Sequence, residues 1–186
     1  MPLDNTSFIF KFTLLALLSG ITSAIIAYIF NDIFYEDWTI YFLFFGQGLI
    51  YSLFTLKIIS SEYKGSHTKL IWFLCSSISY PVAMTAGVSE TFGYIDYDPI
   101  LWVVSIVGSL IVSVGYKIVV SKSNKTLPTI NIIYVIIAGV FVVLVLEKII
   151  SVFENRTLLH SSIYIIWPTV VSFMLAFNTR EKVIYL

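Results

Sequence analysis

Charged residues are what this chain of 186 residues lacks over most of its length. Only 12% of its residues are charged and 58% are hydrophobic, whereas a soluble domain has about 25% charged residues. A helix of about 20 apolar residues, within a range of about 17–25, crosses the hydrocarbon core of a bilayer. Six stretches of 17 or 19 residues contain no Asp, Glu, Lys or Arg, and they lie at 12–30, 38–56, 70–88, 100–116, 128–146 and 161–177.

These stretches predict the fold class. In lipid, backbone polar groups must be paired inside the protein, so each stretch is expected to be a transmembrane α-helix. The segments between them are too short to hold a soluble domain. The sequence therefore predicts one all-α integral membrane domain over residues 1–186, arranged as a bundle of six transmembrane helices.

The charges between the stretches alternate by side. Nine of the eleven basic residues fall on one side of the predicted bundle, and eight of the eleven acidic residues fall on the other. Because short loops rich in Lys and Arg remain in the cytoplasm, we expect both termini to be cytoplasmic and the bundle to lie in the cytoplasmic membrane of a bacterium or archaeon. The net charge of zero gives no indication of direct nucleic-acid binding.

Lysines of the basic side have two interpretations. They could contact anionic lipid or a cytoplasmic protein, or they could serve only to set the orientation of the bundle. The residues concerned are Lys64, Lys69, Lys117, Lys122 and Lys125. Three aromatic residues near the same side, Tyr63, Trp72 and Tyr116, are predicted to anchor the bundle at the membrane interface, with ligand binding as the alternative.

Residues for catalysis or metal binding are scarce. The single cysteine, Cys75, excludes an intrachain disulfide and is expected to be a small packing residue. The two histidines, His67 and His160, fall on opposite sides of the predicted membrane. Neither a His-Glu-x-x-His nor a Gly-x-Ser-x-Gly motif occurs. We therefore expect no enzymatic activity, no cofactor and no metal.

Polar and helix-breaking residues inside the stretches are the candidates for a binding site. An unpaired amide in hydrocarbon costs about 2–7 kcal/mol, so Gln47 either hydrogen-bonds to a neighbouring helix or lines a pore or solute site. Pro81 and Pro168 each leave a carbonyl unpaired one turn earlier. They are either tolerated kinks or breaks that line a central site. Tyr80 and Trp167, each just before a proline, would line such a site.

The third and sixth stretches resemble each other. Residues 76–81 and 161–168 each contain a pair of serines followed by an aromatic residue and a proline. A weak inverted repeat of three plus three helices, as in many transporters, would produce this similarity. The spacing from the serine pair to the proline differs, however, and the second and fifth stretches show little likeness.

Small residues spaced by four lie on one face of a helix and let two helix backbones approach closely. Such a face either packs inside the bundle or meets a second copy in a homo-oligomer. The rows are Ala16, Gly20 and Ala24 in the first stretch, and Ser105, Ser109 and Ser113 in the fourth.

Three functions remain open. The first is a non-enzymatic membrane subunit that forms a homo-oligomer or a heteromeric complex, or that anchors and signals to a cytoplasmic partner, as in a transport complex or a cell-defence system. The second is small-solute binding or transport. In length and number of spans the chain is similar to the substrate-binding subunits of energy-coupling-factor vitamin transporters. The similarity is limited to this outline, because no motif of that family can be placed on these residues. The third and least favoured is an intramembrane enzyme that modifies lipid.

Overall fold

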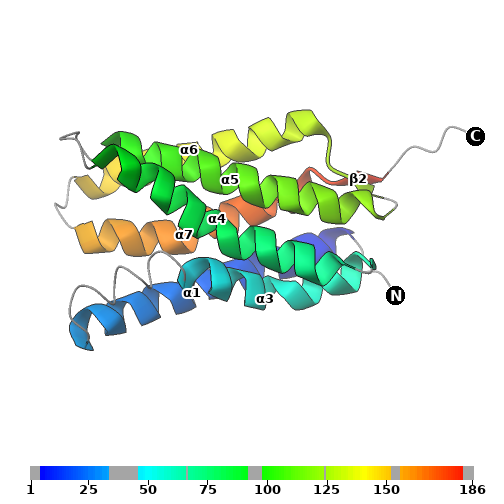
Figure 1. Cartoon of the computed structure of the whole chain (residues 1–186), viewed down its shortest axis with the longest axis horizontal. Helices are drawn as coiled ribbons and strands as arrows, with labels where there is room; N and C mark the ends of the chain where they lie inside the picture. The colour runs from blue at the N-terminus through cyan, green and yellow to red at the C-terminus, as the bar shows by residue number, and fades with distance from the viewer. Residues whose placement is uncertain are drawn as a thin grey trace, which may run out of the picture.

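The computed structural model describes residues 5–33, 46–65, 67–91, 98–123, 125–151 and 156–181. Within these ranges the chain is helical apart from one small antiparallel sheet (Figure 1). The helices are α1 (Asn5–Ile33), α3 (Gln47–Glu62), α4 (Thr68–Thr91), α5 (Asp98–Ser121), α6 (Thr129–Ser151) and α7 (Arg156–Phe177). Strands β1 (Lys125–Thr126) and β2 (Arg180–Glu181) form the sheet.

The all-α prediction is confirmed for the described residues. Five predicted stretches coincide with α1, α4, α5, α6 and α7, and most of these helices extend several residues past the apolar segment. The stretch 38–56 is described only from residue 46, and its earlier part lies outside the described residues.

Three of the described helices are long and apolar enough to cross a membrane. These segments are Asn5–Ile29, Trp102–Ser121 and Thr129–Leu146, and a shorter apolar segment covers Ile165–Phe177.

The helices form a closed ring in sequence order. Each described helix packs against those before and after it, and α1 packs against α7. Consecutive helices run in opposite directions, and the start of α1 lies at the same end as β2 (Figure 1). Those basic residues of the predicted basic side that the structure describes lie in the helix turns, strands and loops at this end, which we call the basic end.

Apolar side chains cover the outside of the ring and many small polar side chains lie inside it. The exposed large residues include Leu14 and Leu18 on α1 and Ile137 and Phe141 on α6. Monomeric soluble proteins rarely expose large contiguous apolar surfaces. The buried hydroxyl residues include Ser52, Ser76, Ser79, Ser105, Ser109, Ser113 and Ser172. This distribution matches a bundle surrounded by lipid.

Candidate functional site

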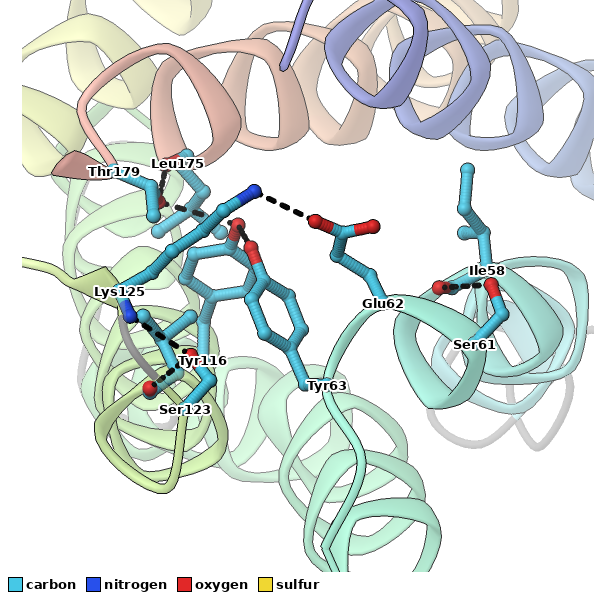
Figure 2. A network of polar contacts seen from close by, with 10 residues as sticks. Ile58, Ser61, Glu62, Tyr63, Tyr116, Ser123, Lys125, Leu175 and Thr179 are labelled. Atoms are coloured by element: carbon cyan, nitrogen blue, oxygen red, sulfur yellow. Dashed lines mark hydrogen bonds and ion pairs between the residues drawn. The ribbon is translucent and has the colours of Figure 1, made fainter. Parts of the chain in front are cut away.

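An ion pair at the basic end joins α3 to the loop between α5 and α6 (Figure 2). Lys125 Nζ lies 2.6 Å from Glu62 Oε1, and the Glu62 side chain is only 2% exposed. A turn after α5 places Lys125, because Ser123 Oγ donates to the Val120 carbonyl and accepts from the Lys125 amide. The Lys125 ammonium also lies 5.8 Å from the centre of the Phe8 ring, within the range of a cation–π contact.

A second contact crosses the ring of helices beside this ion pair. The hydroxyls of Tyr63 and Tyr116 lie 2.8 Å apart, and Thr179 Oγ lies 3.3 Å from the Tyr116 hydroxyl (Figure 2). Thr179 follows α7, so the contact joins the ends of three helices. Burial, and next the adjacent Tyr116, raise the pKa of the Tyr63 hydroxyl far above its ordinary value.

Aromatic side chains fill the axis of the ring next to these polar contacts. Their ring centroids lie 5.6–6.0 Å apart in stacked, tilted or edge-to-face pairs, distances typical of favourable aromatic pairs. This aromatic plug consists of Phe8, Phe12, Tyr51, Tyr63, Trp72 and Tyr116, each at most 3% exposed. It closes the described interior at the basic end.

The plug corrects one sequence-based prediction. Tyr63, Trp72 and Tyr116 were predicted to anchor the bundle at the membrane interface, and this is wrong, because all three are at most 1% exposed. Their polar atoms bond within the protein: Trp72 Nε1, for example, donates to Thr55 Oγ1 at 2.9 Å. Hydropathy gives the depth of an aromatic residue but not the helix face that it occupies.

The five lysines predicted to contact a partner or lipid divide into two groups. Lys64, Lys69 and Lys122 are exposed. Lys117 instead donates to Thr129 Oγ1 at 2.6 Å and joins α5 to α6. Lys125 is held by Glu62, so these last two lysines fix the local structure of the basic end.

The two aromatic residues that precede prolines meet inside the ring. Tyr80 on α4 and Trp167 on α7 form an edge-to-face pair with centroids 5.5 Å apart, although their helices are not neighbours in the ring. Trp167 Nε1 donates to Ser105 Oγ on α5 at 2.9 Å. Both aromatic residues are less than 8% exposed. Two of the three predicted ligand or pore candidates are therefore adjacent.

The third candidate, Gln47, is 2% exposed near the start of α3. Its neighbour Gly48 lies against the backbone of α4, since a Cβ there would lie 2.5 Å from the Ser77 carbonyl oxygen. This is the carbonyl that Pro81, inside α4, leaves without its helical donor. The close approach accounts for Gly48 through helix packing rather than through room for a ligand.

The small-residue rows are buried inside one copy of the chain. Ala16 is 0% exposed, and Ser105, Ser109 and Ser113 are at most 3% exposed. Gly20 is also buried and Ala24 is partly buried. This burial supports the helix-packing interpretation of the rows. A second copy would have to use other surfaces.

Pro81 and Pro168 lie inside α4 and α7, as the sequence predicts. Cys75 is a packing residue: it lies in α4 against Gly115 of α5, where any side chain would collide with it. Among the described residues, no group of three His, Cys, Asp or Glu side chains could hold a metal ion.

Sequence reasoning missed the pairing of Glu62 with Lys125 and the aromatic plug. Glu62 is one of three acidic residues on the predominantly basic side, with Asp4 and Glu181, and that exception is a signal that could have drawn attention to it. A search for similar proteins gives no match to a family model, to a curated protein or to a solved structure. The function must therefore be argued from the residues themselves.

Proposed function

We propose that the chain is a non-enzymatic membrane subunit with six transmembrane helices and both termini in the cytoplasm. The apolar outer surface of the ring supports insertion in lipid. The excess of Lys and Arg at the end that carries β2 and the start of α1 supports a cytoplasmic location for that end. A bacterial or archaeal cytoplasmic membrane fits this arrangement.

The basic end would be a docking platform for a cytoplasmic partner. The observation that carries this proposal is that the basic end is both fixed and positively charged. The ion pair, the Tyr63–Tyr116 contact and the two strands hold its loops together. Exposed lysines surround this fixed structure: Lys11, Lys57, Lys64, Lys69 and Lys122. A rigid positive surface favours binding of a negatively charged protein surface through electrostatic complementarity.

The test is the composition of the complex isolated from native membranes in mild detergent. Native mass spectrometry of the parent is expected to show a bound protein. The variant with Lys64, Lys69 and Lys122 all replaced by Gln should lose it, because the attractive charges are removed. Raising the salt concentration should have the same effect, since exposed charges are screened within about 8 Å at physiological ionic strength.

Lys148→Gln is the matched control, because Lys148 is also an exposed lysine but lies at the end of α6 opposite the basic end. It should retain the bound protein. A parent that leaves the membrane as a monomer with only lipid attached would contradict the platform. Equal loss of the partner in Lys148→Gln would show that total charge, and not the basic end, determines binding.

A further inference from the structure

The connection between α5 and α6 crosses the basic end of the ring. In the ring, α4 and α7 separate α5 and α6 from α1 and α3, so these two pairs of helices lie opposite each other. Lys125 nevertheless reaches across, because its Nζ lies 2.6 Å from Glu62 Oε1 at the end of α3 (Figure 2). The same ammonium lies 5.8 Å from the centre of the Phe8 ring on α1. We call residues 125–127 the strap.

The two ends of the strap are attached differently. On its own side of the ring, β1 pairs with β2, and the Lys125 amide donates to Ser123 Oγ at 3.1 Å. Beside them, Asn131 Nδ2 donates to the Asn178 carbonyl at 3.1 Å and ties the start of α6 to the end of α7. On the far side, the described strap residues make their ionic and ring contacts through the Lys125 side chain. One side chain therefore holds the strap to α1 and α3.

This far attachment is of a kind that can be released at a small net cost. The Lys125 side chain is 20% exposed and that of Glu62 is 2% exposed. The cost of taking two charges out of water opposes their mutual attraction, so such a pair contributes little net stability. When the strap lifts, both charges regain water, which offsets much of the lost attraction. Burial of Leu127, which is 1% exposed, favours the closed position.

We propose that the strap is a gate at the basic end of the ring and that the Glu62–Lys125 ion pair is its latch. In the closed state the Lys125 ammonium lies over the Phe8 ring of the aromatic plug. In the open state Lys125 and Leu127 turn to water, while β1 stays paired with β2. The gate does not depend on the docking platform, since neither latch residue is one of the exposed lysines that form it.

The test measures how often the strap opens. Leu127→Cys, in a Cys75→Ala background, places a thiol that is buried when the strap is closed. In the purified full chain in detergent, this thiol should react slowly with a water-soluble maleimide. Glu62→Gln and Lys125→Gln should each raise the rate about tenfold or more, because each removes a hydrogen bond between charged groups. The two substitutions together should raise it no further, since they remove the same contact.

Two controls separate release of the latch from other effects. Lys117→Gln removes another lysine contact of the basic end, the bond from Lys117 Nζ to Thr129 Oγ1 at 2.6 Å, and should leave the labelling rate unchanged. Ser23 is 1% exposed and lies well along α1 from the basic end. A cysteine at Ser23 reports loosening of the whole bundle and should react at one slow rate in all variants.

Hydrogen exchange at residues 125–127 gives a second readout in the chain that keeps Leu127. Glu62→Gln should speed the exchange of these amides and leave the middle of α6 unchanged. Equal labelling and exchange rates in the parent and in Glu62→Gln would overturn the gate. An effect of Glu62→Gln on Ser23→Cys as large as on Leu127→Cys would also overturn it, because the whole bundle would then have loosened.

Discussion

At the scale of single residues, the contact between Glu62 and Lys125 places a carboxylate with 2% exposure against an ammonium with 20% exposure. Removing one member of a buried pair leaves the other charge without compensation, which is more costly than the net value of the pair. The partial exposure of Lys125 reduces this effect, because water can solvate the ammonium. The pair therefore fixes a conformation more than it adds to the total stability.

We predict that Glu62→Gln lowers the free energy of unfolding by about 1–3 kcal/mol, the range for hydrogen bonds to charged groups and for unsatisfied buried groups. Unfolding in mixed detergent micelles would measure the change. The same substitution should cost much less in a Lys125→Gln background, since the ammonium is then absent. Equal costs in both backgrounds would show that Glu62 is stabilised by something other than Lys125.

The Tyr63–Tyr116–Thr179 contact predicts which of two tyrosine substitutions lowers the stability more. The Tyr116 hydroxyl has two neighbours, at 2.8 Å and 3.3 Å, so its loss affects both Tyr63 and Thr179. Tyr63→Phe leaves Thr179 as a neighbour of Tyr116. We therefore predict that Tyr116→Phe lowers the unfolding free energy by about 1–3 kcal/mol and more than Tyr63→Phe does. The reverse order in the same unfolding assay would contradict this hydrogen-bond arrangement.

At the scale of helices, the sequence predicted where the elements lie better than which way they face. Apolar length alone located α7, whose predicted end at residue 177 is the observed one. Tyr116 was assigned to the membrane interface because it lies at a helix end, yet its side chain points to the axis. The face of an apolar helix is hard to predict because the lipid-facing and interior sides are both apolar in composition.

Gly48 illustrates the same limit. The sequence left its neighbour Gln47 either bonded to another helix or lining a pore or solute site, and only the structure shows that the Ser77 carbonyl lies against Gly48. We predict that Gly48→Ala lowers the unfolding free energy by about 1–3 kcal/mol, the usual cost of overpacking, because a backbone carbonyl cannot move without displacing α4. This cost should exceed the gain of about 1 kcal/mol from replacing Gly by Ala in a helix.

Gly65→Ala is the matched control for this substitution. A Cβ at Gly65 would meet the Thr68 hydroxyl at 2.7 Å, which belongs to a side chain and can rotate away. Its unfolding free energy should therefore stay close to that of the parent. A Gly48→Ala variant as stable as Gly65→Ala would show that α3 and α4 do not approach so closely in the membrane.

At the scale of the whole molecule, the interior of the closed ring differs along its axis. The aromatic plug and the ion pair close and fix the basic end, whereas the serine row and the Tyr80–Trp167 pair lie further along the axis. A continuous open pore along this axis is incompatible with six buried aromatic side chains at one end.

The docking platform at the basic end depends on the orientation of the bundle in the membrane. With both termini cytoplasmic, a cysteine introduced at Lys64 or Lys122 should react with a membrane-impermeant maleimide only after the reagent is given access to the cytoplasmic face of the membrane. A cysteine at Lys148, exposed near the other end, should react in intact cells. The background is Cys75→Ala, which removes the one native thiol and keeps the Cβ that packs against Gly115. Labelling of Lys64→Cys in intact cells would show that the bundle has the opposite orientation. The lysines of the basic end could then not meet a cytoplasmic partner.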